Sequence, residues 1–317
     1  MDIQEIKTRA TDVIYLDDCK DRMIKNFIHG ITKAETTYIE PLNPHFNWLK
    51  QDLTLFGGLP NHGKSTFVYQ LALLRALKTG EKFAIFTPEN NPPDYFFDDL
   101  IHMILGSSIH YGNEKVISLD SYQKWMDFIN DHFFYLFPQN DLHTPEYIQD
   151  RFREAISKHG VTGCIIDPFN QLDNDWKREG RDDFYISGFL SQYKRFALTN
   201  KIYMIIVAHT KSAIKKASNG IDYETPDIYD LAGGAMWGNK CDNIIFIHRP
   251  FKVSNPESEI VKIKISKIKK QKMVGRTGEI ELEYNYLMNR YRWISQTGMY
   301  QDGFMSKQEV LTNEIPF

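Results

Sequence analysis

The sequence of 317 residues lacks several features that would place it in a particular class of protein. Its three cysteines, Cys19, Cys164 and Cys241, show neither the paired spacing of a disulfide framework nor that of a zinc site. No apolar run approaches the ~18 residues that a membrane-spanning helix requires, and the first residues lack the apolar core of a signal peptide. These absences predict a reduced, intracellular protein without membrane contact and without a cysteine-based metal site.

A strong net charge is also missing. The 38 lysines and arginines nearly balance the 41 acidic residues, which leaves a net charge of −3. Any contact with nucleic acid must therefore come from local basic loops and not from the field of the whole protein. Hydrophobic residues make up 42% and aromatic residues 14% of the chain, enough for a large core and too much for global disorder. The length suits one large α/β domain with appendages or two modest domains.

What the sequence does contain is a phosphate-binding loop. Residues 58–65, Gly-Leu-Pro-Asn-His-Gly-Lys-Ser, fit the pattern G-x-x-x-x-G-K-[ST] without a mismatch, after an apolar strand and before a helix expected over 64–78. Glycines let the backbone N–H groups surround a phosphate, and the positive end of the helix dipole faces the same anion. The pattern predicts a nucleoside triphosphate site, with Lys64 on the β- and γ-phosphates and Ser65 on Mg²⁺. The residues expected to bind the nucleotide in this loop are Gly58, Pro60, Asn61, His62, Gly63, Lys64, Ser65 and Thr66.

Two acidic residues follow buried strands. Glu89 comes after the strand expected over 82–87, and Asp167 directly follows the apolar residues 161–166. Doubly wound sheets bind ligands at the carboxyl ends of their strands. Glu89 could orient or deprotonate the water that attacks a γ-phosphate, or it could be an ordinary solvated loop acid. Asp167 has the arrangement of a Walker B acid, which holds the Mg²⁺ shell.

The next buried strand, 202–209, ends in His209. A histidine there could be structural, or it could lie beside Asp167 and respond to the γ-phosphate. Residues 210–226 follow as a long loop without the pattern of a helix or strand, and such loops are often functional or disordered. A contact with single-stranded nucleic acid is one interpretation, with salt-sensitive affinity, and a mobile solvated loop is the other. The lysines that favour the first are Lys211, Lys215 and Lys216.

Two paired strands are expected near the end of the chain, over 260–272 and 278–284. The apolar alternation shifts its phase between Ile265 and Ile268, which predicts a β-bulge. The first strand ends in a crowd of lysines, which favours contact with phosphate or, alternatively, an edge strand protected against aggregation. These lysines are Lys267, Lys269, Lys270 and Lys272.

From about Gly30 to Trp293 the chain resembles the RecA-like motor domain of hexameric replicative DNA helicases, the DnaB and Twinkle class. The resemblance is carried by Gly58 to Ser65, Thr87-Pro-Glu89, Ile165-Ile-Asp167, Val207-Ala-His209, Asp230-Leu to Asn239 and Asp242, and Gly275-Arg-Thr-Gly278. It implies an α/β fold with a mostly parallel central sheet, flanking helices and a C-terminal β-hairpin. It also implies an ATP-dependent enzyme, using Mg²⁺ with ATP or another NTP, that translocates on single-stranded DNA as a ring, expected to be a hexamer.

The resemblance also implies roles for single residues. Glu89 would activate water, Asp167 would lie in the Mg²⁺ shell, and His209 would sense the γ-phosphate. Asn239 stands where many members have a phosphate-contacting Gln. Arg249 and Tyr284 match positions that sandwich the nucleotide base. The loops that would line the DNA channel, 173–183 and 210–226, supply the expected DNA contacts Lys177, Arg178, Arg181, Lys211, Lys215 and Lys216.

One departure concerns the arginine finger that many members place on the last hairpin. Residues 267–272 contain no arginine. Lysine can supply the charge of a finger but not its bidentate fork. We expect Lys270 to take this role in the neighbouring subunit's site, with Lys272 and Arg276 as alternatives.

We expect three segments: an N-terminal segment 1–40, an ATPase domain 41–295 and a flexible tail 296–317. The helix near 16–29 resembles a linker that docks on the next subunit. Because no primase segment precedes the motor in this sequence, we expect a helicase-only polypeptide or a fragment of a longer one. The last residues, 313–317, are similar to the C-terminal tip by which bacterial single-stranded-DNA-binding proteins engage partners. Coincidence is the alternative explanation for so short a match. A primase, a polymerase or such a binding protein are candidate partners, in the cytoplasm of a bacterial or phage-infected cell. The alternative functions are a RecA-like recombinase or regulatory ATPase, and a non-catalytic ATP-binding DNA ring or loader.

Overall fold

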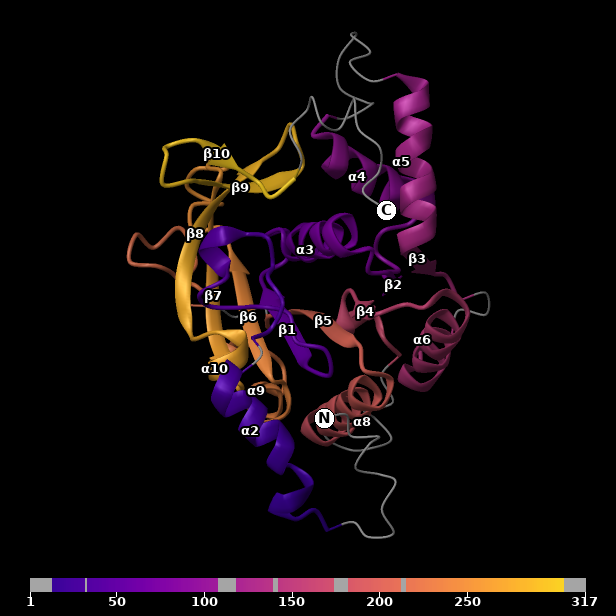
Figure 1. Cartoon of the computed structure of the whole chain (residues 1–317). Helices are drawn as coiled ribbons and strands as arrows, with labels where there is room; N and C mark the ends of the chain where they lie inside the picture. The colour runs from indigo at the N-terminus through magenta and orange to yellow at the C-terminus, as the bar shows by residue number, and fades with distance from the viewer. Residues whose placement is uncertain are drawn as a thin grey trace.

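The computed structural model describes residues 13–31, 33–107, 118–138, 142–173, 182–211 and 215–304. In this part of the chain one sheet has the strand order β10-β9-β8-β7-β6-β1-β5-β4-β2-β3 (Figure 1). Its parallel strands are β1 (Leu53–Gly58), β2 (Phe83–Phe86), β3 (Phe133–Leu136), β4 (Gly163–Ile166), β5 (Tyr203–His209) and β6 (Asn243–His248). The antiparallel strands are β7 (Ile260–Ile268), β8 (Gly278–Asn285), β9 (Arg290–Ile294) and β10 (Tyr300–Gln301). The predicted fold class is confirmed.

Helices cover both faces of the parallel strands, which explains why those strands are almost continuously apolar. Along β1, Leu55 packs into one core and Phe56 into the other, because successive side chains point to opposite faces. The helices on the face of Phe56 are α3 (Lys64–Thr79), α4 (Pro93–Leu105) and α5 (Leu119–His132). Those on the face of Leu55 are α6 (Pro145–His159), α8 (Asp182–Asn200) and α9 (Gly234–Lys240). Within the described residues, no helix is long and apolar enough to cross a membrane.

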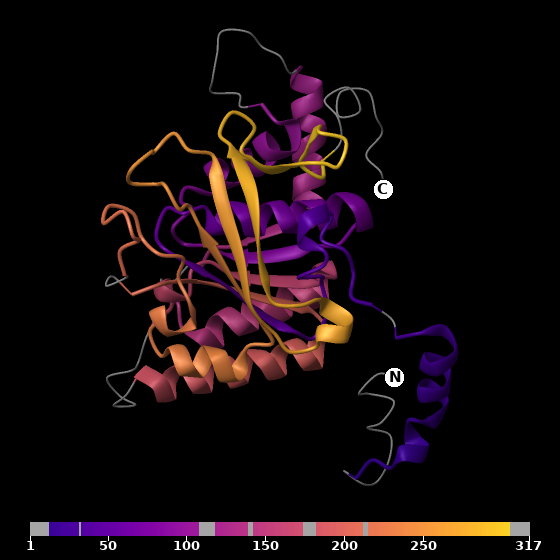
Figure 2. The same cartoon turned by 90° about the vertical axis from the view of Figure 1, so that its left-hand side faces the viewer.

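The predicted N-terminal helix exists as α2 (Lys20–His29), after a short 3-10 turn η1 (Leu16–Asp18). Figure 2 shows α2 standing apart from the sheet and its helices. None of its residues is buried, and the Phe27 side chain is 91% exposed. Docking of this helix on another subunit stays a prediction. A second 3-10 turn, η2 (Glu40–Leu42), leads into the domain.

Strand β7 has the predicted bulge but ends earlier than predicted. Ile244 pairs with Lys267 and the next residue, Ile245, pairs with Ile265, which leaves one extra residue on β7. The strand stops at Ile268, and α10 (Gln271–Val274) forms a single helical turn where we expected strand. The buried Val274 draws the chain back onto the domain, and its carbonyl oxygen accepts a hydrogen bond from Asn47 at 2.9 Å.

The residues expected to form a tail from 296 onward partly belong to the domain. Strand β10 pairs with β9, which we did not predict as a strand. Asp302 forms an ion pair with the buried Arg290, whose guanidinium lies 4.2 Å from the Phe304 ring. The domain therefore extends to Phe304. The predicted tip at 314–317 lies outside the described residues.

Residues 215–224 contain paired backbone that their sequence did not suggest. Lys216 and Tyr223 form an isolated antiparallel bridge, and the backbone N–H of Ala217 donates to the carbonyl of Asp222 at 2.9 Å. Residues 215–224 are therefore a small hairpin, called the basic hairpin below for its exposed Lys215 and Lys216. A further 3-10 turn, η4 (Ile228–Asp230), follows it. The sequence gives no signal for this hairpin, because so few paired residues leave no recognisable periodicity.

Candidate nucleotide-binding site

The phosphate loop joins the end of β1 to the start of α3. Gly63 has a φ of +86°, and its carbonyl oxygen accepts a hydrogen bond from the Tyr291 hydroxyl at 2.8 Å. A Cβ atom at Gly63 would collide with that hydroxyl. Glycine is thus required twice, by the left-handed backbone and by the neighbouring tyrosine. The loop is held in shape from β9, by a tyrosine 228 residues further along the chain.

Alanine at Gly63 is expected to destabilise the protein more than alanine at Gly160, a glycine of similar backbone conformation (φ +70°) with open space around it. The left-handed conformation alone costs about 1–2 kcal/mol with a Cβ, and overpacking against Tyr291 adds about 1–3 kcal/mol. Urea unfolding of Gly63→Ala and Gly160→Ala measures the difference. Tyr291→Phe in the Gly63→Ala background should recover much of it. Equal losses at the two glycines would contradict this account.

Lys64 occupies the first position of α3 and is buried. Burial lowers the pKa of Lys64 to about 8, although the charges of Asp167 and Glu89 oppose this shift. Its ammonium donates a hydrogen bond to the carbonyl oxygen of Leu59 in the same loop at 2.7 Å. A buried ammonium of this kind is stabilised by a bound anion.

Ser65 and Asp167 meet across the sheet edge. The Ser65 hydroxyl donates to Oδ1 of Asp167 at 3.1 Å, and the Tyr69 hydroxyl donates to Oδ2. Burial raises the pKa of Asp167, and the two hydrogen bonds and Lys64 oppose the shift. A hydroxyl next to a carboxylate at the end of a parallel strand is the oxygen donor set that suits Mg²⁺ in phosphate-loop proteins. These residues therefore fit the cation that the sequence predicted.

Glu89 lies on the same edge, between two polar side chains. Oε1 accepts a hydrogen bond from Gln171 at 2.9 Å, and Oε2 lies 3.9 Å from Nε2 of His209. The second distance exceeds that of a hydrogen bond, so Oε2 is near the histidine but not bound to it. Gln171 ends the 3-10 turn η3 (Phe169–Gln171) that follows β4.

His209 stands next to the phosphate loop because Gly58 and His209 are paired residues of β1 and β5. Burial and the nearby Lys64 charge lower the pKa of His209, whereas Glu89 opposes the shift. The ring is therefore neutral at pH 7. Its Nδ1 is buried and has no hydrogen-bond partner among the described residues.

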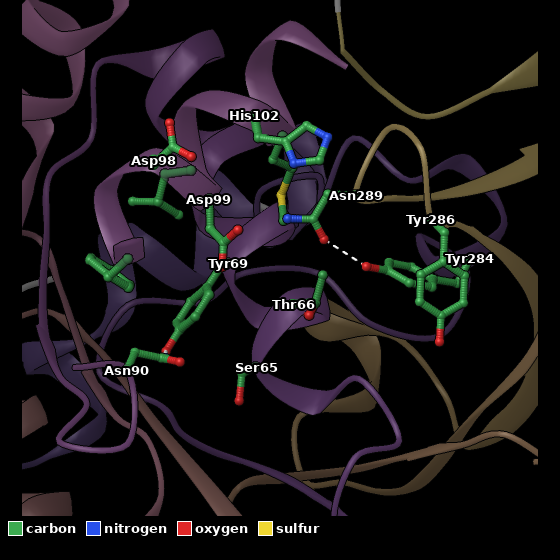
Figure 3. A pocket seen from close by; sticks show the side chains of 13 residues that line it. Ser65, Thr66, Tyr69, Asn90, Asp98, Asp99, His102, Tyr284, Tyr286 and Asn289 are labelled. Carbon is green, nitrogen blue, oxygen red and sulfur yellow. Dashed lines mark hydrogen bonds between the residues drawn. The ribbon is translucent and has the colours of Figure 1, made fainter. Parts of the chain in front are cut away.

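A cavity of about 380 Å³ opens beside the loop (Figure 3). Ser65, Thr66 and Tyr69 line one wall, and Tyr284 and Asn289 line another, joined by a hydrogen bond of 2.6 Å from the tyrosine hydroxyl. Asp98, Asp99 and His102 of α4 also line it, as does Tyr286. The volume lies in the range of small-molecule sites.

The predicted base sandwich is only partly assembled. Tyr284 lines the cavity, and burial raises its pKa to about 12. Arg249 is buried instead between backbone carbonyls and Tyr286, whose hydroxyl accepts a hydrogen bond from its guanidinium at 2.8 Å. Tyr286, and not Tyr284, is therefore the ring beside Arg249.

Two predicted site residues lie elsewhere. Asn239 is exposed at the end of α9, just before β6 begins, and Lys270 forms an ion pair with the buried Asp52 just before β1 begins. Both therefore lie at the amino edge of the parallel strands, whereas Lys64 lies at the carboxyl edge. Neither residue therefore lies beside Lys64 within the chain, and a contact with the phosphates of a neighbouring subunit stays a prediction.

Of the predicted DNA contacts, Lys211 and Lys215 are exposed. Lys216 places its ammonium 3.9 Å from the centroid of the Tyr223 ring. The remaining predicted contacts, Lys177, Arg178 and Arg181, lie outside the described residues.

Sequence reasoning missed three residues of the hydrogen-bond network around Asp167 and Glu89. Tyr69 lies four residues after Ser65 on α3, hence on the same helix face, and helical spacing could have found it. Asn90, which donates to the Tyr69 hydroxyl at 3.0 Å, directly follows Glu89. Gln171 follows Asp167 by four residues through a turn whose geometry has no clear sequence signal.

Comparison with known proteins gives consistent matches. Residues 36–293 match the DnaB-like helicase C terminal domain family. The Twinkle homolog protein, chloroplastic/mitochondrial, of Arabidopsis thaliana is 28% identical over 276 residues, which cover 83% of this chain and 37% of that protein. The chain thus spans little more than a third of that relative's length.

Solved structures agree in fold. One, described as an ATPase domain, superposes with a TM-score of 0.72 at 16% identity, covering 88% of this chain and 99% of that one. A DnaB-like replicative helicase, described with its interactions with primase, gives the same TM-score and identity and covers 88% of this chain and 68% of that one. The family match over well over half of the sequence decides the assignment: this chain belongs to the DnaB-like helicase C-terminal domain family.

Proposed function

We propose that this chain is the ATP-hydrolysing motor of a replicative DNA helicase, which translocates on single-stranded DNA and unwinds duplex DNA. The observation that carries the proposal is the meeting of Lys64, the Ser65–Asp167 pair and Glu89 at the carboxyl edge of one parallel sheet. Lysine, hydroxyl, Walker B acid and a second acid are the parts that phosphoryl transfer needs.

In this mechanism Lys64 exchanges the Leu59 carbonyl for the β- and γ-phosphates of ATP. The N-terminal end of α3 adds its dipole to the same anion. Ser65 and Asp167 would hold Mg²⁺, which supplies neutralisation of the phosphate charge. Tyr69 fixes the second oxygen of Asp167, so that the carboxylate keeps one orientation.

Glu89 orients the attacking water and accepts its proton. Gln171 fixes one oxygen of the carboxylate, which leaves the other toward His209 and the phosphate loop. Because His209 is neutral, it does not neutralise Glu89 as a base. Lys211, a proposed DNA contact, lies only two residues beyond His209. A change at the γ-phosphate therefore occurs close to that contact.

The proposal includes a homo-oligomer, a hexamer, with ATP bound between subunits. It is supported by the placement of Lys270 and Asn239 at the edge opposite the phosphate loop, where they could serve a neighbouring copy. A primase is a candidate partner because one structural relative is described with primase.

The test measures ATP turnover with and without single-stranded oligonucleotide, together with unwinding of a forked duplex. We expect Mg²⁺-dependent turnover that rises with oligonucleotide and loses this stimulation at high salt, and we expect strand separation. Stimulated turnover without strand separation would favour the recombinase or regulatory ATPase. Binding of ATP and DNA without turnover would favour the non-catalytic ring or loader.

A further inference from the structure

Two buried histidines connect the phosphate loop with the basic hairpin. His62 belongs to the loop, and its ring stacks on that of His248, the last residue of β6, with the centroids 5.2 Å apart and the planes at 20°. Nδ1 of His62 accepts a hydrogen bond from the backbone N–H of Arg249 at 2.9 Å. The phosphate loop is thus attached to the end of β6 by a stack and by a hydrogen bond.

The second histidine also reaches the hairpin. Nε2 of His248 lies 3.1 Å from the carbonyl oxygen of Tyr223. Burial lowers the pKa of His62 to about 3 and that of His248 to about 4, so both rings are neutral. A carbonyl oxygen can only accept, so Nε2 of His248 carries the hydrogen and donates a hydrogen bond to the Tyr223 carbonyl oxygen. This hydrogen bond fixes the tautomer of His248 and orients the ring on which His62 stacks.

The basic hairpin also contacts the segment that follows β6, through Asp222, the residue before Tyr223. The Asp222 carboxylate accepts hydrogen bonds from the backbone N–H groups of Val253 and Ser254, at 3.1 and 3.0 Å. On the other side of the hairpin, the Lys216 ammonium lies over the Tyr223 ring. A ligand that binds Lys216 therefore acts on Tyr223, whose carbonyl oxygen accepts the hydrogen bond from His248.

We propose that His248 is a positioning residue that couples polynucleotide binding at the basic hairpin to nucleotide binding at the phosphate loop. The physical path is short and continuous: Lys216, Tyr223, His248 and then His62. A shift of the Tyr223 carbonyl turns the His248 ring, and the stacked His62 carries the shift into the backbone that surrounds the phosphates. This inference rests on the proposed function, because it concerns the same two ligands.

The experiment measures the equilibrium affinity of the full chain for a fluorescent non-hydrolysable ATP analogue with Mg²⁺, with and without an oligothymidylate. The reverse titration is also made, since binding coupling is reciprocal. Wild type should show coupling of about 5- to 150-fold, the usual span of such effects. In His248→Phe, which keeps a stacking ring but has no donor for Tyr223, the ratio should fall to within twofold of one. His248→Gln, which has a donor but no ring, should lose the coupling as well.

The matched control is His132→Phe on α5. His132 stacks on Phe128 at 4.2 Å and also contacts a backbone carbonyl, at 2.8 Å, and it lies at the end of α5, directly before the edge strand β3. It should couple as wild type does. Coupling retained in either His248 variant overturns the inference and leaves the proposed function standing. A tenfold loss of affinity of a His248 variant for either ligand alone has the same meaning. Absence of coupling and of stimulated turnover in wild type overturns both.

Discussion

Replacing Glu89 by Gln is expected to lower oligonucleotide-stimulated ATP turnover about 10²- to 10⁴-fold, the usual contribution of a positioned general base. The amide has the shape of the carboxylate and can still accept a hydrogen bond from Gln171, but it cannot take a proton from water. Affinity for ATP and Mg²⁺ should stay within about threefold, because Lys64, Ser65 and Asp167 are untouched. Turnover and nucleotide binding are measured on the same preparation.

Glu279→Gln is the matched control. Glu279 on β8 has nearly the same side-chain exposure as Glu89, 42% against 45%, and lies 3.2 Å from the Lys262 ammonium. Its variant should turn over ATP at the wild-type rate. A Glu89→Gln enzyme that keeps more than a tenth of wild-type turnover would show that another group activates the water.

Replacing Lys64 by Met is expected to weaken ATP binding without destabilising the unliganded protein. The lost charge-assisted hydrogen bonds are worth about 1.5–3 kcal/mol, or roughly 10- to 100-fold in ATP affinity. The unliganded variant should melt at the wild-type temperature or above it, because burial already disfavours the Lys64 charge, as its lowered pKa shows. Wild type should gain about 2.7 kcal/mol at an ATP concentration 100 times its Kd, and the variant should gain far less at that concentration.

Lys262→Met provides the comparison, since Lys262 is a partly exposed lysine on β7. It should keep the full stabilisation by ATP. A Lys64→Met protein whose melting temperature rises with ATP as much as that of wild type would remove Lys64 from the phosphate site.

Sequence reasoning located the residues that are tied to strand ends. Asp167 and His209 follow long apolar runs, and parallel strands must place their carboxyl ends at one edge. The bulge of β7 was also predictable, because a shift of one residue turns every following side chain to the other face. These features depend on local patterns, which a single sequence carries.

Other features depend on contacts between distant segments. Tyr291 holds Gly63, and Arg290 binds the carbonyls of Met103 and Ile104 on α4, so β9 belongs to the site although its own sequence looks unremarkable. The helical turn α10 stands where we expect strand, because Val274 is buried and its carbonyl oxygen is hydrogen-bonded to Asn47. No periodicity within either segment signals such long-range packing.

The opposite placement of Lys64 and Lys270 has a consequence for symmetry. If Lys270 serves the phosphates of an adjacent copy, each contact joins two different surfaces, so the interface is heterologous and cannot close as a two-fold dimer. Repetition of such a contact gives a ring when the rotation closes and a helical filament when it does not. A small change in the angle between copies would then separate an unwinding ring from a filament built of the same subunit.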